Sequence, residues 1–560
     1  MQKPWLAHYP AGVPADIDMS QYASLVELLE ASFKNFADRE AAVCMDKSIT
    51  YGEIDRHSLG LASWLQSKGL QPGARVAIMM PNVLQYMVAI AAILRAGYVV
   101  VNVNPLYTPR ELEHQLKDSG SEAIIVLENF AATLEKVIDQ TSVRHVVLAT
   151  MGDMMGAVKG TIVNFAVRHV RKMVPAFEFR PSATLSVTGF NDAVSGGKSL
   201  PFKRPELGPN NVAFLQYTGG TTGVSKGATL LHRNVVANIL QSEAWFNPLL
   251  KKVNGQSIVM VCALPLYHIF ALTCCYMLGA RLGMKNILIP NPRDIPGFIG
   301  VLKKHKVNMF PAVNTLFNAL AEAPGIEQVD FSELVVSNGG GTAVQQATAA
   351  RWLKLTNCHI MEGYGLSETS PVATINSIDI TGFTGTIGLP IPSTEVEIRD
   401  DDGHEVPLGE RGEICIRGPQ VMAGYWNRPE ETSNAISADG FFKSGDIGVM
   451  DPTGAIKIVD RKKDMILVSG FNVYPNEIEQ VVGMHPGVLE CAAVGVEDER
   501  SGEAVSLFVV RRDPALTEAA LAEYCRENLT AYKRPKLIQF RTDLPKTNVG
   551  KILRRELRAA

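Results

Sequence analysis

The sequence lacks several features that would have assigned it to a class at once. Its eight cysteines include no CxxC pair, so the pattern indicates neither a zinc site nor a disulfide framework. The formal net charge is only −3, so nothing favours nucleic acid as a partner. The N-terminal segment MQKPWLAHYPAG contains no apolar signal core. We therefore expect a cytoplasmic protein with reduced cysteines.

One long stretch has no charged side chains and raises the question of a membrane span. Residues 257–280 contain no Asp, Glu, Lys or Arg, and a helical span needs about 20 apolar residues. However, Pro265 and His268 lie in the middle of the stretch. We therefore expect a buried strand over 258–264, a loop, and a buried helix from about residue 270. A membrane span stays the alternative.

Length and patterning predict an α/β protein with more than one domain. The chain has 560 residues, too many for one hydrophobic core, and 46% of them are hydrophobic. In the first half, β-rich runs such as 75–81 alternate with helical patterns such as 83–97. This alternation predicts a parallel sheet with helices on both faces. The pattern changes near residue 460, so we expect a large domain over 1–460 and a small α+β domain over 461–560.

Residues 152–180 interrupt this alternation with a basic, amphipathic stretch. Its apolar side chains include Val163, Phe165, Ala166, Val167, Val170 and Met173, and its basic ones include Lys159, Arg168, Arg171 and Lys172. An ordinary surface helix packed on the core is one interpretation. Transient contact with an anionic membrane face is the other.

Residues 217–228, YTGGTTGVSKGA, follow the apolar run 212–215 and predict phosphate binding. Glycines allow backbone N–H groups to converge on an anion, and threonines add hydroxyl donors. Lys226 adds a point charge. The segment differs from the common phosphate loop GxxxxGK[ST], because Ser225 precedes the lysine and Gly227 follows it. On composition alone, a flexible surface turn is equally compatible.

The order TGGTTGxxKG resembles the phosphate-binding signature of the adenylate-forming (ANL) superfamily, which includes acyl-CoA synthetases, luciferases and amino-acid adenylation domains. Further segments match this superfamily along nearly the whole chain: SNGGG at 337–341, GYGLSET at 363–369, KSGDIGVMD at 443–451 and PKTNVGK at 545–551. The run 439–475 resembles the fatty acyl-CoA synthetase branch. The resemblance implies an α/β fold with a large N-terminal domain of layered α/β subdomains plus a distorted β-barrel, and a small, mobile α+β C-terminal domain.

This resemblance also implies the residues of an ATP site. Tyr364 would stack on adenine, Glu368 would bind Mg²⁺, and Asp446 would accept hydrogen bonds from the ribose hydroxyls. Arg461 would reach ribose or phosphate. Taken singly, such residues are more often found in packing, a helix cap or a turn. The other nucleotide positions implied are Tyr217, Thr218, Gly219, Gly220, Thr221, Thr222, Gly223, Gly339, Gly340, Gly341, Gly363, Gly365 and Ser367, with Thr218 also a magnesium ligand.

The catalytic groups follow from the same resemblance. Lys551, on the small C-terminal domain, would bridge the substrate carboxylate and the α-phosphate, and Lys226 would stabilise the developing charge. His268 would lie at the acyl pocket, although a lone histidine there is otherwise a satisfied core residue. No Asp accompanies it to hold an ammonium group, which disfavours amino-acid substrates. Leu272 stands where some long-chain enzymes have a gating tryptophan.

The resemblance further implies two half-reactions separated by a domain rotation about Lys463. The rotation would withdraw Lys551 and bring Gly470 and Phe471 to the pantetheine path, although 469–475 is also compatible with a plain turn before a helix. We therefore expect activation of a medium- or long-chain fatty acid with ATP and Mg²⁺, then transfer to coenzyme A. An aryl or other acid:CoA ligase and a non-catalytic acyl-CoA or nucleotide sensor are the alternatives. Peripheral membrane contact and a homodimer both stay open.

Overall fold

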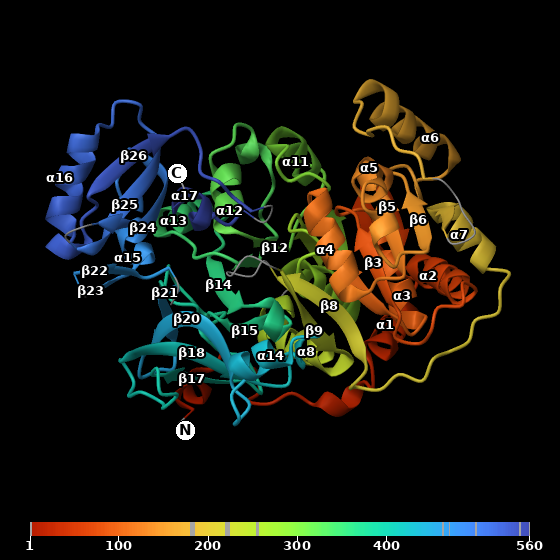
Figure 1. Ribbon diagram of the computed structural model, residues 1–560, viewed down its shortest axis with the longest axis horizontal. Helices are drawn as coiled ribbons and strands as arrows, with labels where there is room; N and C mark the ends of the chain where they lie inside the picture. The colour runs from red at the N-terminus through yellow and green to blue at the C-terminus, as the bar shows by residue number, and fades with distance from the viewer. Residues whose placement is uncertain are drawn as a thin grey trace.

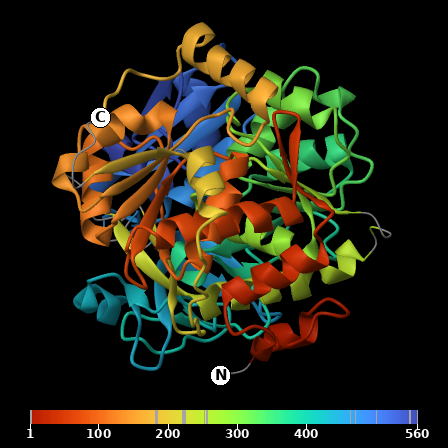
Figure 2. The same cartoon turned by 90° about the vertical axis from the view of Figure 1, so that its right-hand side faces the viewer.

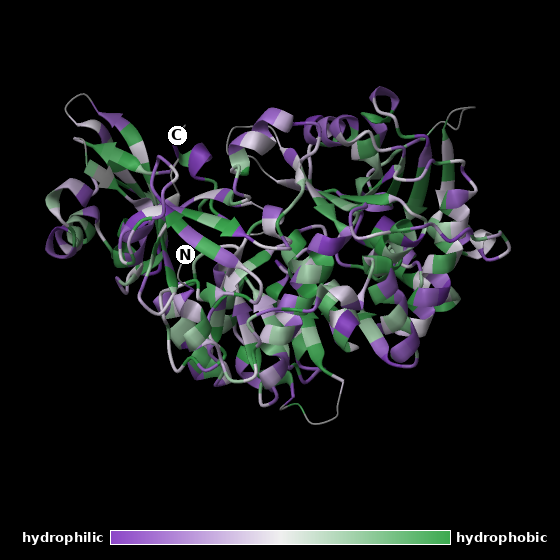
Figure 3. Ribbon diagram, turned by 90° about the horizontal axis from the view of Figure 1, so that it is seen from below, coloured by the Kyte–Doolittle hydropathy of each residue, from purple (hydrophilic) through white to green (hydrophobic). Residues whose placement is uncertain are grey.

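The structure is a computed structural model that describes residues 3–179, 185–218, 225–251, 253, 257–461, 464–469, 471–498, 501–547 and 550–558. The strands of these residues form four sheets (Figure 1). Hydrophobic residues are concentrated in the strands, whereas the peripheral helices carry both kinds of residue (Figure 3). All eight cysteines fall within the described residues, and each is buried with a free thiol.

The first large sheet has eight strands and confirms the predicted alternation. Its strands from β8 to β7 run parallel to one another, and β9 and β19 are added antiparallel at one edge. The predicted strand 75–81 is β3, and the predicted helix 83–97 is α3 (Leu84–Arg95). In spatial order the strands are β19 (Gly424–Tyr425), β9 (Lys226–Leu231), β8 (Val212–Thr218), β4 (Val99–Asn102), β3 (Arg75–Met79), β5 (Ala123–Leu127), β6 (His145–Ala149) and β7 (Ser186–Gly189).

The second large sheet has nine strands, and a fully buried helix joins it to the first. Every residue of α3 is buried, and the helix contacts both β3 of the first sheet and β1 of the second. A helix that is apolar on all sides is stable in water only when it is enclosed in this way. In spatial order the strands are β16 (Leu389–Pro390), β15 (Val372–Ile375), β14 (Ile360–Gly365), β13 (Val336–Gly339), β12 (Met309–Ala312), β10 (Val259–Cys262), β11 (Lys285–Leu288), β1 (Glu40–Cys44) and β2 (Lys47–Thr50).

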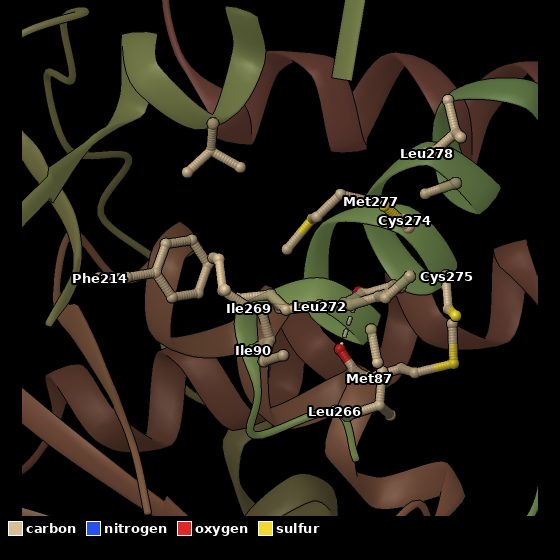
Figure 4. Packing of buried hydrophobic residues seen from close by; sticks show 14 of the residues in the cluster. Met87, Ile90, Phe214, Leu266, Ile269, Leu272, Cys274, Cys275, Met277 and Leu278 are labelled. Carbon is tan, nitrogen blue, oxygen red and sulfur yellow. Dashed lines mark hydrogen bonds between the residues drawn. The ribbon is translucent and has the colours of Figure 1, made fainter. Parts of the chain in front are cut away.

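The uncharged stretch 257–280 is part of this core, as expected. It forms β10, a loop, and then α9 (Ile269–Ala271), a π-helical turn η6 (Leu272–Met277) and the start of α10 (Leu278–Leu282). Leu272 is fully buried among apolar side chains that include Ile269, Ile90 and Met87 (Figure 4). Among the described residues, no helix combines the length and the apolarity that crossing a bilayer demands.

A third sheet stands where a distorted β-barrel was expected. It has four antiparallel strands, and within the described residues no pairing joins its outer strands β17 and β21. The sheet is therefore open rather than closed, because four strands are too few to enclose an interior filled by side chains. Its strands are β17 (Glu395–Arg399), β18 (Arg411–Arg417), β20 (Phe442–Met450) and β21 (Ile456–Arg461).

The chain beyond β21 forms a separate α+β unit with its own core. Apolar residues such as Ile466, Ile478 and Leu507 make a cluster distinct from those of the large sheets. The unit lies at one end of the molecule (Figure 1). Its strands are β22 (Ile466–Val468), β23 (Phe471–Val473), β24 (Val488–Asp498), β25 (Gly502–Arg511) and β26 (Leu537–Arg541), and its helices are α15 (Pro475–Gly483), α16 (Glu518–Asn528) and α17 (Arg554–Arg558).

Candidate active site

Two glycine motifs lie side by side at the carboxyl ends of β13 and β14. Gly339 pairs with Glu362 across these parallel strands. A Cβ atom on Gly340 would meet the Phe270 ring at 2.9 Å, and one on Gly365 would meet the Pro371 carbonyl oxygen at 1.9 Å. Only glycine fits such approaches. The predicted positions Gly339, Gly340, Gly341, Gly363 and Gly365 therefore line one edge of the nine-stranded sheet, where α/β folds commonly bind ligands.

The residues predicted to hold adenine and ribose contact each other. The Tyr364 phenol donates a 2.7 Å hydrogen bond to Oδ2 of Asp446, whose side chain is buried. Asp446 pairs with Arg461 across β20 and β21. The two motifs are 82 residues apart in the chain, so only the packing of the open four-stranded sheet against β14 brings them together.

Glu368 and Lys226 are connected through a tyrosine that the sequence did not indicate. Glu368 is buried, and its Oε1 accepts a 2.8 Å hydrogen bond from the Tyr425 phenol. The Lys226 ammonium lies 5.5 Å from the centroid of the same ring and forms an ion pair with Glu431. Burial and the neighbouring Glu368 carboxylate raise the pKa of Tyr425, so the phenol keeps its proton and donates.

The ends of the glycine- and threonine-rich segment are held by paired strands. Thr218, the last residue of β8, pairs with Lys226, the first residue of β9. The Tyr217 phenol donates a 2.6 Å hydrogen bond to Asp118, which also pairs with Arg428 at 2.7 Å. Seven of the predicted site and hinge positions lie outside the described residues: Gly219, Gly220, Thr221, Thr222, Gly223, Lys463 and Gly470.

His268 lies at the apolar end of the site, within reach of the charge of the C-terminal Lys551. His268 caps the N-terminus of α9, and its Nδ1 accepts a 3.4 Å hydrogen bond from the Phe270 N–H. Burial, with a smaller contribution from the Lys551 charge, lowers the pKa of His268 to about 4, so the imidazole is neutral at pH 7. Next to Lys551, a Cβ on Gly550 would meet Thr315 Oγ1 at 2.5 Å. The small unit thus places its last loop against the large one.

Phe471 lies apart from this group. Its side chain is 55% exposed and stacks on Tyr532 of the same small unit, with 4.8 Å between ring centroids. Ser367 begins a short turn, η8 (Ser367–Thr369), that carries Glu368. Of the predicted residues of the small unit, Lys551 therefore lies on a loop packed against the large unit, while Phe471 faces solvent.

Several residues of the site were missed at the sequence level. Tyr425, Glu431 and Arg428 belong to the segment GYWNRPEET, and Asp118 lies at the end of α4 (Pro109–Ser119). Glu362 is a further buried carboxyl group, and burial raises its pKa to about 7. The only sequence signal was the close spacing of aromatic and charged residues in that segment, because β19 has just two residues and no visible periodicity.

Comparison with known proteins agrees with this arrangement. The family model described as "AMP-binding enzyme" matches residues 29–426, and the "AMP-binding enzyme C-terminal domain" matches residues 477–551. The chain belongs to the AMP-binding enzyme family. This confirms the resemblance to the adenylate-forming superfamily, whose large N-terminal and small C-terminal parts the fold reproduces.

Relatives in this family match over full length. The chain is 55% identical to a long-chain-fatty-acid–CoA ligase of Escherichia coli O6:H1, covering 100% of this chain and 98% of that protein. It is 36% identical to a long-chain-fatty-acid–CoA ligase of Bacillus subtilis, covering 99% and 98%. Among solved structures, ATP-bound MatB from Rhodopseudomonas palustris superposes with a TM-score of 0.78 at 26% identity, covering 95% and 98%.

Proposed function

We propose that the protein is a long-chain fatty-acid–CoA ligase. It joins a medium- or long-chain fatty acid to AMP from ATP and then transfers the acyl group to coenzyme A, releasing AMP and pyrophosphate. The observation that carries this proposal is the contact between groups predicted to bind ATP: Tyr364 bonds to Asp446, and Tyr425 links Glu368 to Lys226. The loop that carries Lys551 packs against the same large unit at Thr315. The full-length likeness to enzymes named as long-chain-fatty-acid–CoA ligases supports the substrate class.

In the first half-reaction, a carboxylate oxygen bonds to the α-phosphorus of ATP, and the bond to the β-phosphate breaks. Lys551 balances the charge between the carboxylate and the α-phosphate, and Lys226 balances the charge on the departing pyrophosphate. A neutral His268 beside the carboxylate keeps the acyl end of the site free of a competing cation. No nucleophile of the protein takes part.

The residues present fit a magnesium ion. Glu368 offers a buried carboxylate whose second oxygen is held by Tyr425, and Thr218 offers a hydroxyl at the edge of the phosphate segment. A magnesium ion bound there would draw negative charge from the phosphate oxygens. Tyr364 serves adenine, and Asp446 with Arg461 serves ribose and phosphate. The nucleotide site is completed by the glycines of the two motifs at β13 and β14, by the glycines and threonines of residues 219–223, and by Ser367.

In the second half-reaction, the coenzyme A thiolate attacks the acyl carbon, and AMP leaves. We assign residues 1–460 to an adenylation domain with the ATP and acyl sites, and residues 461–560 to a mobile lid that carries Lys551. Lys463 is the hinge, and Gly470 and Phe471 line the pantetheine path after rotation. The exposure of Phe471 at 55% supports this, because the side chain is available to a second surface.

The enzyme acts in the cytoplasm and makes peripheral contact with the membrane, since long-chain acids partition into bilayers. A homodimer is a further proposal for its assembly. An aryl or other carboxylic acid:CoA ligase is the rival activity, and a non-catalytic acyl-CoA or nucleotide sensor is the rival from another class.

The test is an assay with ATP, Mg²⁺, coenzyme A and straight-chain acids from acetate to stearate, with benzoate beside them. Release of AMP and pyrophosphate with palmitate is expected. Formation of ADP, or a preference for benzoate, would contradict the proposal, and no turnover with any acid would favour the sensor.

Lys551→Ala separates the two half-reactions. Acyl-AMP formation should fall about a hundredfold or more, while thioester formation from pre-made acyl-AMP should persist. Lys546→Ala is the matched control, because Lys546 pairs with Glu490 at 2.6 Å in the small unit. Equal loss of both half-reactions would remove Lys551 from this role.

A further inference from the structure

One helical segment turns its apolar side chains toward solvent. It consists of α6 (Ala157–Phe165) and the π-helical turn η5 (Ala166–Val170), and it lies at the periphery of the molecule in both ribbon views (Figures 1 and 2). We call its exposed apolar residues the outer face. They are Val158, Ile162, Phe165 and Val170, together with Met173 just beyond the segment, with exposed fractions of 76%, 63%, 60%, 68% and 52%.

The spacing places these side chains on one side of the segment. Val158, Ile162 and Phe165 follow the i, i+4, i+7 pattern of a single helix face. The π-helical turn then closes with a 2.8 Å bond from Arg171 N–H to Ala166 C=O, which is the i to i+5 pattern. This longer turn brings Val170 back toward Phe165.

The opposite side of the segment fixes it to the body through small and polar residues. A Cβ on Gly160 would meet the Gly152 carbonyl oxygen at 2.5 Å, so the helix backbone approaches closely there. Asn164 donates a 2.9 Å hydrogen bond to Thr150 and accepts a 2.7 Å bond from the Gly152 N–H. An amphipathic surface helix ordinarily packs its apolar face inward. Here the packed side consists of Gly160, Asn164 and the buried Val167. The first interpretation of this stretch, a helix packed on the core, therefore holds for Val167 but is wrong for the exposed Phe165, Val170 and Met173.

The charged side chains of the segment itself all have one sign. Residues 154–177 contain no Asp or Glu and carry Lys159, Arg168, His169, Arg171 and Lys172. Arg168 pairs with Glu128 at 2.7 Å, whereas Arg171 and Lys172 are exposed at the end of the face next to Met173. Apolar side chains bordered by cations are the composition that binds the interface of an anionic bilayer.

The same charges decide against a second copy of the chain as the occupant. A two-fold interface sets one surface patch against itself, so a patch whose segment carries basic but no acidic residues would supply Arg171 and Lys172 with no opposite charge. Anionic lipid head groups instead supply the opposite charge, and the acyl region accepts the apolar side chains.

We propose that the outer face docks on an anionic membrane, with Ile162, Phe165 and Val170 entering the head-group boundary and Arg171 and Lys172 contacting lipid phosphates. This proposal rests on the proposed function and names the surface through which that enzyme reaches its partner. Docking there holds the protein where a long-chain fatty acid is dissolved.

The test uses the full-length protein and sedimentation with two kinds of vesicle, phosphatidylglycerol mixed with phosphatidylcholine, and phosphatidylcholine alone. The wild type binds the anionic vesicles, and salt weakens the binding. The triple variant Ile162→Ser, Phe165→Ser, Val170→Ser should bind about a hundredfold more weakly. Arg171→Glu with Lys172→Glu should bind about tenfold more weakly and lose the preference for anionic lipid.

Leu537→Ser is the matched control, because Leu537 is 47% exposed on the small unit, and it should bind like the wild type. Activity on soluble octanoate without vesicles should be unchanged in every variant, which separates a docking defect from a failed enzyme assignment. Wild-type vesicle binding by the triple variant would overturn the proposal. A dimer that the triple variant converts to a monomer, with vesicle binding intact, would overturn it in favour of a second copy.

Discussion

The phenol of Tyr425 donates a 2.8 Å hydrogen bond to Glu368, while the face of its ring lies 5.5 Å from the ammonium of Lys226. One side chain therefore contacts both the carboxylate proposed for magnesium and the lysine proposed for phosphate. The pairing of Tyr425 with Ala228 across β19 and β9 fixes this position. The two charges are thus oriented by a neutral group before any nucleotide arrives.

Tyr425→Phe tests the hydrogen bond while keeping the ring. Partners that orient a metal ligand typically contribute tenfold to a hundredfold in metal affinity. We expect the Mg²⁺ concentration for half-maximal acyl-AMP formation to rise about tenfold, with little change in ATP affinity at saturating Mg²⁺. Pyrophosphate release at graded Mg²⁺ measures this. Tyr425→Leu, which also removes the ring from Lys226, should weaken ATP binding as well, and an unchanged magnesium curve for Tyr425→Phe would refute the role.

Glu431→Gln tests the ion pair with Lys226. The two side chains are 25% and 34% exposed, so the pair contributes about 1 kcal/mol or less. A triphosphate has to compete with Glu431 for the lysine, so we expect the Kd for MgATP to fall about threefold. Calorimetric titration measures it. Glu430→Gln, one residue earlier and exposed, should leave the Kd unchanged. A higher Kd for Glu431→Gln would instead mean that Glu431 positions the lysine.

His232 predicts an acid-sensitive contact in the core. Its Nδ1 accepts a 3.1 Å hydrogen bond from Leu25 N–H at the start of α1 (Leu25–Asn35), and burial lowers its pKa to about 4. The unfolded chain, with an ordinary histidine pKa, binds more protons between about pH 6.5 and pH 4. Stability therefore falls as the pH drops through this window, by about 3 kcal/mol in total.

His232→Gln should flatten part of this dependence, because Gln accepts the same bond without titrating. Urea denaturation midpoints at about pH 7 and about pH 5 measure the difference. His404→Gln, at a side chain 81% exposed, serves as the control. His268 has a similarly lowered pKa, so some pH dependence should persist. A slope in His232→Gln equal to that of the wild type would contradict the assignment.

Gly365→Ala tests the close approach of Gly365, in the second glycine motif, to the backbone of Pro371. The new methyl group would stand 1.9 Å from the Pro371 carbonyl oxygen, so the strand end carrying Tyr364 has to move. We expect the rate of acyl-AMP formation to fall about a hundredfold, because a displacement of about 1 Å in a binding group can reduce a reaction rate by that factor. Gly382→Ala, where nothing lies within 4 Å, should retain activity. Full activity in Gly365→Ala would show that the motif tolerates displacement.

The parts of the fold that depend on local pattern could be predicted from sequence. The alternation of apolar runs and helical periods located β3 and α3, and Pro265 with His268 divided the uncharged stretch correctly. The glycine motifs predicted the strand end that carries Tyr364 and the turn after it that carries Glu368. The bond of Tyr364 to Asp446 and the link from Glu368 through Tyr425 to Lys226 could not be derived by periodicity. They join residues 82 and 57 positions apart that meet only in the fold.

Other features had no local signature at all. The two-residue strand β19 places Tyr425 beside Lys226 only through its pairing with β9. The direction of the α6 apolar side chains depends on which side packs, and that choice follows from the contact between Gly160 and Gly152. An amphipathic pattern gives the faces of a helix but leaves undetermined which of them meets the protein.

The ladder between β20 and β21 has a mechanical consequence. Asp446 stands opposite Arg461, the last residue of β21, so the chain leaves the open sheet directly beside the aspartate proposed for the sugar. A rotation about that point would displace the distant end of the C-terminal unit far more than the nucleotide beside the pivot. In the proposed mechanism, Lys551 would then move away while AMP stays bound, so that one nucleotide site would serve both half-reactions.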